Sequence, residues 1–239
     1  MMQTIKLIEV SKSFKSKKAL NKVNIEFHNN RINGLLGPNG SGKTTLFNIV
    51  AGFLSPDLGQ ILLDGNNLED KSLNHRTKLG ISYLPQEASI FRDLTVYENI
   101  FSIAELFQNK NESIKITDNL INQFSLNSFQ KTKGKLLSGG ERRRTEIARA
   151  LASSPKFLLL DEPFAGIDPI AIEEVKSTIS ILKKMKIGII ITDHNVKEAL
   201  SIVDYGYIIY NGEIIKSGSP NDIISDKFVK KIYLGKNFN

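Results

Sequence analysis

The segment from Gly37 to Thr44, with the sequence Gly-Pro-Asn-Gly-Ser-Gly-Lys-Thr, restricts the fold of this chain more than any other feature. It follows the apolar run Ile32–Leu36 and precedes a helical pattern, Thr44–Val50, that ends at Gly52. A loop of the form G-x-x-x-x-G-K-[ST] between a strand and a helix holds phosphate groups with its backbone N–H groups and with the positive end of the helix. The predicted phosphate-binding residues are Gly37, Pro38, Asn39, Gly40, Ser41, Gly42, Lys43, Thr44 and Thr45.

Two side chains of this loop and two acids elsewhere match the needs of a nucleotide and its metal ion. Lys43 can reach the β- and γ-phosphates, and the Thr44 hydroxyl can ligate Mg²⁺. The apolar run Phe157–Leu160 predicts a buried strand that ends at two adjacent acids, Asp161 and Glu162. Successive side chains at a strand end point in different directions, so we expect Asp161 in the Mg²⁺ shell and Glu162 as the general base for the attacking water.

A second apolar run, Ile187–Thr192, leads to Asp193 and His194. The carboxyl ends of parallel strands are where α/β folds bind ligands. The imidazole of His194 can therefore hydrogen-bond a γ-phosphate or the attacking water. A single histidine is more often structural, so this role is inferred from the neighbouring motifs.

The segment Leu137–Glu141, Leu-Ser-Gly-Gly-Glu, opens a further helical pattern. Ser138 and Glu141 form a capping box, which is also the ordinary start of a helix. Gly139 and Gly140 expose backbone N–H groups at that helix start, and such groups can bind an anion. Two phosphate-binding helix ends with one lysine-bearing loop suggest that two copies of the chain share each nucleotide.

Composition and hydropathy exclude several classes of protein. The 239 residues include no cysteine, which excludes disulfides, thiolate zinc sites, iron–sulfur clusters and a cysteine nucleophile. No apolar stretch approaches the ~20 residues of a membrane-spanning helix, and the N-terminus lacks a signal-peptide core, so we expect any membrane role to come through a partner. The net charge of +7 raises the question of a nucleic-acid partner, but it favours a solvated, lysine-rich surface, with nucleotide phosphates and anionic lipid headgroups as the alternatives.

Apolar runs alternate with helical patterns, which predicts an α/β fold with a largely parallel sheet. Two segments indicate antiparallel pairing instead. Ile61–Leu63 leads into Asp-Gly, and Tyr207–Tyr210 is followed by Asn211-Gly212, a strong signal of a type I′ hairpin. Strand signals are absent between about residues 87 and 154, where helical periodicity predicts an inserted helical block. No repeat or linker divides the chain, so we expect a single domain.

Together these motifs resemble those of the ATP-binding-cassette (ABC) ATPases, and the resemblance covers essentially the whole chain. It implies an α/β, ABC-type P-loop NTPase with a mixed sheet, an N-terminal antiparallel β part and an inserted α-helical subdomain. The implied regions are a RecA-like core with the antiparallel β part (about 1–86 and 155–216), the helical subdomain (about 87–154) and a C-terminal helical tail (about 217–239).

The resemblance also implies roles that the local patterns do not. Gln86 falls in the Q-loop, beside the metal and the catalytic groups, and His194 corresponds to the switch histidine. Asp168 falls in the D-loop, although the segment Ala165–Asp168 lacks the serine that many relatives carry. Phe14 lies where the family places an aromatic ring stacked on adenine. Tyrosine is commoner there, but phenylalanine keeps the stacking face.

Within this family, the segments Tyr83–Ile100 and Tyr233–Phe238 are most similar to the ATPases of lipopolysaccharide-export (Lpt) transporters. The resemblance implies a homodimer that binds ATP and Mg²⁺ on the cytoplasmic face of a bacterial inner membrane, with transmembrane subunits as partners. Phe91 and Arg92 would line the groove that receives a cytoplasmic helix of such a subunit.

Three alternatives stay open at this stage. Branched-chain amino-acid importers have ATPases that share every nucleotide motif. An ABC-type ATPase acting on nucleic acid would explain the positive charge, but such proteins usually carry a long coiled-coil insertion or two cassettes, and this sequence has neither, so no nucleic-acid partner is expected. A nucleotide sensor with negligible turnover is disfavoured by Glu162 and His194, because both are groups that hydrolysis needs.

Overall fold

The computed structural model describes residues 3–15, 17–166 and 169–234, and at residues 169–171 and 233–234 it describes the backbone alone. The strands are β1 (Thr4–Phe14), β2 (Lys17–His28), β3 (Ile32–Leu36), β4 (Leu58–Leu63), β5 (Asn66–Asn67), β6 (Ile81–Leu84), β7 (Phe157–Asp161), β8 (Gly188–Asp193), β9 (Tyr205–Tyr210) and β10 (Glu213–Gly218). The α-helices are α1 (Lys43–Ala51), α2 (Leu73–Lys78), α3 (Val96–Ala104), α4 (Lys110–Gln123), α5 (Gly139–Leu151), α6 (Pro169–Lys184), α7 (Val196–Leu200), α8 (Pro220–Ser225) and α9 (Lys227–Val229). Shorter helical turns are η1 (Asn127–Phe129), η2 (Gly134–Leu136) and η3 (Lys230–Leu234).

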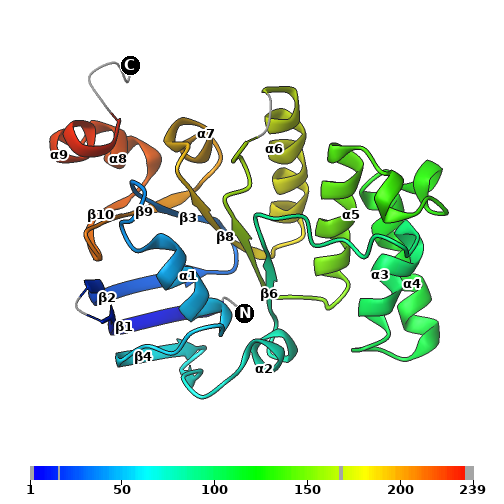
Figure 1. Ribbon diagram of the computed structural model, residues 1–239, viewed down its shortest axis with the longest axis horizontal. Helices are drawn as coiled ribbons and strands as arrows, with labels where there is room; N and C mark the ends of the chain where they lie inside the picture. The colour runs from blue at the N-terminus through cyan, green and yellow to red at the C-terminus, as the bar shows by residue number, and fades with distance from the viewer. Residues whose placement is uncertain (1–2, 16, 167–168, 235–239) are drawn as a thin grey trace.

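The central sheet has the strand order β10-β9-β3-β8-β7-β6 (Figure 1). Strands β9, β3, β8, β7 and β6 run parallel, and β10 pairs antiparallel with β9 at one edge. The turn between β9 and β10 is Asn211-Gly212, with φ values of 48° and 79°. Both residues therefore adopt the left-handed conformation that a type I′ hairpin requires. The parallel sheet and this hairpin agree with the sequence-based prediction.

A second, antiparallel sheet of order β2-β1-β4-β5 shares a hydrophobic core with α1 and with one face of the first sheet. Successive residues of β7 enter different cores. Leu158 and Leu160 pack with helices on one face, while Phe157 and Leu159 pack with α1 and the antiparallel sheet on the other. Because both faces of the parallel sheet are covered, its strands are continuous apolar runs, as the sequence indicated.

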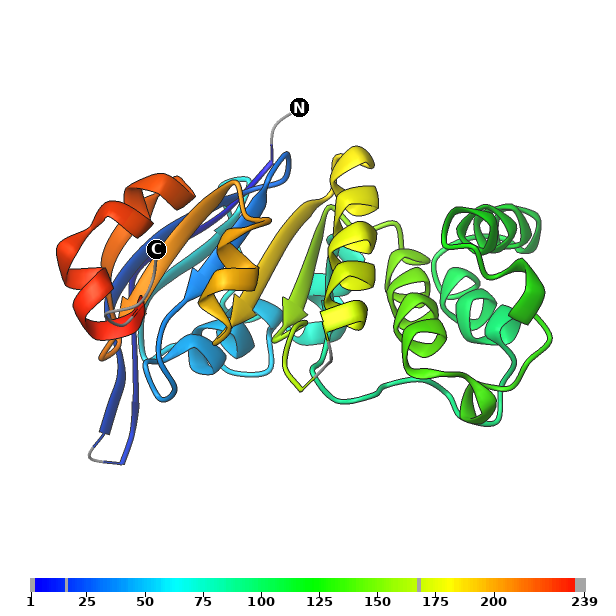
Figure 2. The ribbon, with the colours of Figure 1, turned by 90° about the horizontal axis from the view of Figure 1, so that it is seen from above.

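Helices α3, α4 and α5 pack together at the end of the molecule beside β6 (Figures 1 and 2). The predicted fold, a mixed sheet with an antiparallel part and a helical insertion, is thereby confirmed. The division into subdomains near residues 87 and 154 stays a prediction. β10 extends to Gly218, which lies opposite Gly206 of β9, and the C-terminal helices follow it from α8.

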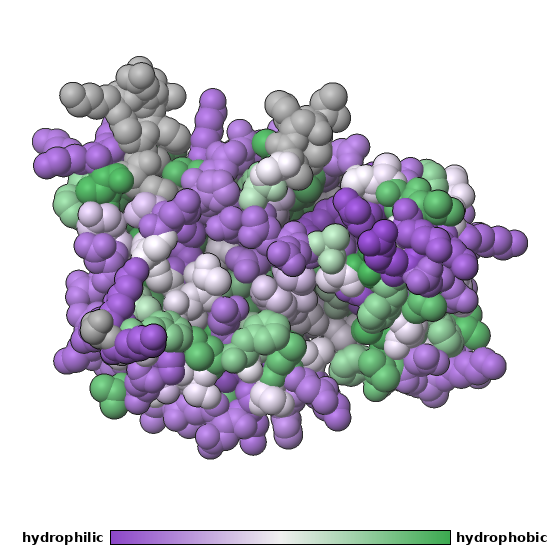
Figure 3. Space-filling view, viewed as in Figure 1, coloured by the Kyte–Doolittle hydropathy of each residue, from purple (hydrophilic) through white to green (hydrophobic). Residues whose placement is uncertain are grey.

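The surface is mostly polar on the face shown in Figure 3, where apolar side chains gather in patches over the region between α1 and α2 and beside the helices α3–α5. In the described part of the chain, none of the helices combines the length and apolar character needed to cross a membrane.

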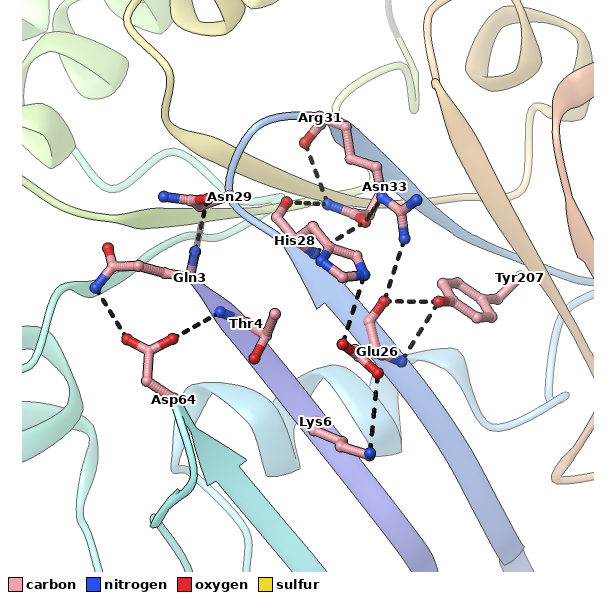
Figure 4. Close-up of polar contacts among 10 residues, drawn as sticks. All are labelled: Gln3, Thr4, Lys6, Glu26, His28, Asn29, Arg31, Asn33, Asp64 and Tyr207. Atoms are coloured by element: carbon pink, nitrogen blue, oxygen red, sulfur yellow. Dashed lines mark hydrogen bonds and ion pairs between the residues drawn. The ribbon is translucent and has the colours of Figure 1, made fainter. Parts of the chain in front are cut away.

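A polar network holds the beginning of β3, at the end of the strand opposite the glycine-rich loop (Figure 4). Asn33 is fully buried and its amide donates to the carbonyl oxygens of His28 (3.0 Å) and Ile189 (3.1 Å). Arg31 donates to the Asn33 side chain at 3.0 Å and lies over the ring of Tyr205, 4.3 Å from its centroid. These contacts connect the start of β3 to the end of β2 and to its neighbours β8 and β9 in the sheet, and so fix where β3 positions the loop at its other end.

Candidate functional site

The loop between β3 and α1 has glycines where a side chain would collide with the backbone. A Cβ at Gly37 would lie 2.2 Å from the carbonyl oxygen of Ile209, and one at Gly42 would lie 2.7 Å from that of Ala19. Gly42 also has a φ of 112°, which L side chains rarely adopt. It is the N-cap of α1, and no side chain caps this helix. The first N–H groups of α1 are therefore left for a ligand, as a phosphate site requires.

Lys43 is buried beneath the loop to which it belongs, with 4% of the residue exposed. Its ammonium group donates to the carbonyl oxygens of Gly37 at 2.7 Å and Pro38 at 3.1 Å. Burial lowers the pKa of Lys43, and the charges of Glu162 and Asp193 oppose that shift. The Lys43 ammonium group is therefore close enough to Glu162 and Asp193 to interact with their charges. The fold thus brings the loop together with the acids at the ends of β7 and β8.

Asp161 ends β7 with each carboxylate oxygen held by a different neighbour. The hydroxyl of Thr192 donates to Oδ1 at 2.6 Å, and that of Tyr83 donates to Oδ2 at 3.2 Å. Burial, together with the Asp161 charge, raises the pKa of Tyr83 to about 12, so the phenol stays a donor. The fixed carboxylate, the Thr44 hydroxyl and the exposed Gln86 amide are oxygen donors of the kind that Mg²⁺ prefers.

No group of three or more His, Asp or Glu side chains in the described residues could hold a metal ion by itself. Magnesium is usually bound through one or two carboxylates together with phosphate oxygens and water. The single carboxylate of Asp161 with a nearby hydroxyl fits that pattern. A metal site at Asp161 would therefore depend on a phosphate ligand for the rest of its oxygen donors.

Glu162 and His194 face each other across the ends of β7 and β8. Oε2 of Glu162 lies 3.1 Å from Nδ1 of His194. Glu162 has a φ of 42°, and its N–H donates to the carbonyl oxygen of Thr192 at 2.9 Å, so the chain leaves the strand at this residue. His194 follows Asp193, which is fully buried and accepts the N–H of Asn195 at 2.7 Å. A carboxylate beside an imidazole can accept a proton from water.

The start of α5 is exposed and internally capped. The N–H of Ser138 donates to Glu141 at 2.9 Å, and the side chain of Ser138 accepts the N–H of Glu141, which confirms the predicted capping box. The backbone of Gly140 abuts the carboxylate of Glu174 in α6. In Figure 2 the starts of α1 and α5 lie on the same side of the molecule but well apart, with β6, β7 and β8 between them.

A cavity of about 540 Å³ separates α5 from the ends of the strands. The residues that line this cavity include Gln86, the predicted Q-loop residue, and Glu162, the predicted general base. Gly139 and Gly140, at the start of α5, line it as well. The walls of the cavity come from the segments that follow β6 and β7 and from α5 and α6. The position of Gln86 between the metal site and the helical block stays a prediction.

The other predicted site residues lie at the surface or outside the described residues. Phe14 ends β1 with 48% of the residue exposed, and the ammonium of Lys12 lies 5.9 Å from its ring centroid. Phe91 and Arg92 are both exposed on the segment between β6 and α3. Stacking of adenine on Phe14 and a partner groove at Phe91 and Arg92 stay predictions. Asp168 lies outside the residues that the structure describes.

Sequence reasoning missed Thr192 and Tyr83, the two residues that hold Asp161. Thr192 is 1% exposed, and its hydroxyl also lies 3.3 Å from the backbone nitrogen of Glu162. The signal was the parallel pairing of β7 and β8, which sets Asp161 opposite Thr192. That register is a long-range property, and it becomes visible only when the two strands are aligned.

Comparisons with known proteins agree with this geometry. Residues 20–165 match the protein family described as "ABC transporter". The chain is 46% identical over 231 residues to the "Lipopolysaccharide export system ATP-binding protein LptB" of Haemophilus influenzae, covering 96% of this chain and 96% of that protein.

Solved structures show the same fold. A crystal structure of the ADP conformation of an ATP-binding cassette of an ABC transporter matches with a TM-score of 0.85 and 28% identity, covering 99% of this chain and 100% of that one. A dimeric post-hydrolysis state of an ATP-binding cassette bound to ADP and phosphate matches with a TM-score of 0.76 and 25% identity, covering 90% of this chain and 98% of that one.

The family match includes the phosphate loop and the acidic end of β7, and the full-length relative extends the likeness through His194. This chain belongs to the ABC transporter family, as one of its nucleotide-binding subunits, and it is an enzyme that hydrolyses ATP.

Proposed function

We propose that this chain is the ATPase subunit of a transporter that extracts lipopolysaccharide from a bacterial inner membrane and exports it towards the outer membrane. The Haemophilus relative carries that role in its name, and the likeness extends over nearly all of both chains. The chain works as a homodimer, attached through transmembrane subunits to the cytoplasmic face of the membrane. The nucleotide is ATP with Mg²⁺.

Glu162 is the general base of this reaction. Its carboxylate, oriented by the His194 imidazole at 3.1 Å, takes the proton from the water that attacks the γ-phosphorus. The loop N–H groups and Lys43 hold the phosphates and stabilise the charge that develops on them. Asp161, Thr44 and Gln86 would hold Mg²⁺, which neutralises phosphate charge when it is bound.

The observation that carries the homodimer is the separation of the two helix starts. Lys43 and the loop lie at the start of α1, while Ser138 and Gly140 lie at the start of α5, on the same side of the molecule but apart (Figure 2). A second copy, rotated by a two-fold axis, would bring its own Ser138–Gly140 segment to the phosphates. The shared ATP then closes the dimer, and loss of the γ-phosphate lets the copies part.

The remaining assigned residues surround that shared nucleotide or face the membrane. Phe14 stacks on the adenine, and Asp168, which is outside the described residues, corresponds to the D-loop aspartate of the family. Phe91 is 45% exposed, although it is large and apolar, and together with Arg92 it receives a cytoplasmic helix of a transmembrane subunit. The helical block at about 87–154 transmits motion from the seam to this groove.

The cargo is tested by purifying the tagged protein from its native membranes together with its partners and reconstituting the complex in vesicles. We expect transmembrane subunits to copurify and ATP to drive release of lipopolysaccharide from the vesicles, with the Glu162→Gln complex inactive. ATP-driven uptake of branched-chain amino acids instead would assign the chain to an importer. Salt-sensitive binding to nucleic acid that exceeds membrane association would contradict both transport functions.

A further inference from the structure

The carboxylate of Glu146 is buried and has no part in the hydrolysis just described. It lies in α5, and 2% of the residue is exposed. Its Oε1 accepts the N–H of Ser89 at 2.7 Å and that of Ile90 at 3.1 Å. These residues lie on the segment that leaves β6, passes Gln86 and crosses α5 on its way to α3 (Figure 1). A buried charge on α5 thus binds the backbone immediately before Phe91.

Two arginines on the same face of α5 bind the same segment. Arg143 donates to the carbonyl oxygen of Pro85 at 3.2 Å, and the Arg149 guanidinium lies 4.7 Å from the ring centroid of Phe91. Positions 143, 146 and 149 are three residues apart, so their side chains follow one another along one side of the helix. Burial lowers the pKa of both arginines and the Glu146 charge opposes that shift, so this carboxylate offsets two partly buried cations.

The segment is held by the other helices after it passes α5. Asn99 of α3 is fully buried, accepts the N–H of Phe91 at 2.9 Å and donates to the carbonyl oxygen of Phe91 at 3.0 Å. The N–H of Lys135 donates to the carbonyl oxygen of Arg92 at 2.9 Å. Phe91 and Arg92 are therefore attached to the helical block by hydrogen bonds on both sides.

We propose that Glu146 is a positioning residue that makes the Ser138–Gly140 end of α5 and the Phe91–Arg92 surface move as one unit. When a nucleotide on a second copy engages Ser138, α5 shifts, and Glu146 carries the backbone of residues 89–90 with it. This inference rests on the proposed function, from which it takes the nucleotide contact at Ser138 and the partner contact at Phe91. It adds the physical link between those two surfaces.

The link is tested with one fluorescent probe beside the groove. The chain has no cysteine, so Asp93→Cys, an exposed position, gives a single labelling site. In the Glu162→Gln background, we expect ATP to change the probe signal over the same concentration range in which the dimer forms. Glu146→Ala should still dimerise with ATP but lose most of the probe response. Glu146→Gln, whose amide oxygen can accept both N–H groups, should retain it.

Hydrogen exchange at Ser89 and Ile90 reports the link itself. In Glu146→Ala these amides should exchange about tenfold faster or more, the size expected for the loss of hydrogen bonds to a charged acceptor. If the alanine variant does not fold, the glutamine variant decides the matter. If the glutamine variant keeps its exchange protection at Ser89 and Ile90, it should also keep the probe response. If it loses the protection, it should lose the probe response as well.

The outcomes separate this inference from the function on which it rests. A Glu162→Gln parent that binds ATP without dimerising would refute the proposed function. A parent that dimerises normally, with the same probe response in Glu146→Ala as in the parent, would overturn this inference alone. So would a glutamine variant that loses exchange protection at residues 89–90 and still responds fully.

Discussion

Oε2 of Glu162 and Nδ1 of His194 lie 3.1 Å apart although the two residues follow different strands. The parallel pairing of β7 with β8 sets Asp161 opposite Thr192, so Glu162 and His194, one and two residues further on, lie beyond neighbouring strand ends. Glu162 then leaves the strand with a φ of 42°. The carboxylate and the imidazole are thus brought together by the neighbouring ends of β7 and β8.

Replacing the base should separate binding from hydrolysis. Glu162→Gln keeps the size and a hydrogen-bonding oxygen but cannot take a proton, so turnover should fall by ~10²-fold or more, the usual contribution of a general base. ATP affinity should stay close to that of the unmodified protein. Phosphate release measures the first quantity and nucleotide titration the second. Undiminished hydrolysis would remove Glu162 from the mechanism.

The hydroxyl of Thr192 should set the affinity for Mg²⁺, because it donates to Asp161 at 2.6 Å. Thr192→Val nearly preserves volume and removes that donor. We expect the Mg²⁺ concentration for half-maximal ATPase activity to rise about tenfold, since a hydrogen bond to a charged group contributes about 1.5 kcal/mol. Thr192→Ser keeps the hydroxyl and is the matched control. Identical Mg²⁺ dependence in the valine and serine variants would show that this contact does not orient Asp161.

Arg76 should be a major source of stability, because it holds the end of α1 through main-chain carbonyls. It is 1% exposed and donates to the carbonyl oxygens of Ile49 (2.6 Å), Val50 (2.9 Å) and Leu68 (2.6 Å). Arg76→Met has similar length but leaves these oxygens without a donor, so the free energy of unfolding should fall by about 3 kcal/mol. Urea denaturation measures it, with Arg76→Lys as the control that keeps one donor group. A loss below about 1 kcal/mol would contradict this role.

Stability should depend on Tyr83 in alkaline solution. Burial raises the pKa of Tyr83 to about 12 from an ordinary value of 10.0. Between these values the unfolded chain releases the phenolic proton while the folded chain keeps it, so the free energy of unfolding falls as pH rises from 10 to 12. The decline should be shallower in Tyr83→Phe, measured by urea denaturation at a series of pH values. If the free energy of unfolding fell equally steeply with pH in Tyr83→Phe and in the parent protein, the raised pKa of Tyr83 would be contradicted.

Replacing Phe91 in the proposed partner groove should weaken assembly with the transmembrane subunits without affecting ATP hydrolysis. Phe91→Ala should bind and hydrolyse ATP as an isolated protein yet copurify poorly with its transmembrane subunits, because it removes an exposed apolar side chain at the proposed contact. Phe228→Ala is the matched control, since Phe228 is also exposed (52%) but lies in the C-terminal helices. Normal copurification of the Phe91 variant would defeat the assignment.

The sequence predicts those features that are encoded in consecutive residues. The uncapped start of α1 follows from Gly42, the hairpin from Asn211-Gly212, and the capped start of α5 from Ser138 and Glu141. Each is a local requirement of the backbone, so one segment is enough to reveal it.

Long-range pairs escaped prediction for a physical reason. Thr192 lies opposite Asp161 through strand register, and Glu146 bonds to Ser89, 57 residues earlier in the chain. Arg76 occupies a short helix in a lysine-rich segment, where an arginine is ordinarily exposed. Its burial depends on carbonyls at the end of α1 that no local pattern brings near it. Packing between distant segments, and not propensity, determines all three.

Cross-linking between two different variants tests the shared nucleotide most directly. The chain has no cysteine, so copies with Asn39→Cys can be mixed with copies with Ser138→Cys, both in the Glu162→Gln background, and treated with a short bifunctional thiol reagent. The account predicts a cross-linked dimer that forms in the mixture only when ATP and Mg²⁺ are present. The contradicting result has two parts. The mixture gives no cross-linked dimer, and a single chain that carries both substitutions forms a cross-link within itself and stays at monomer mass.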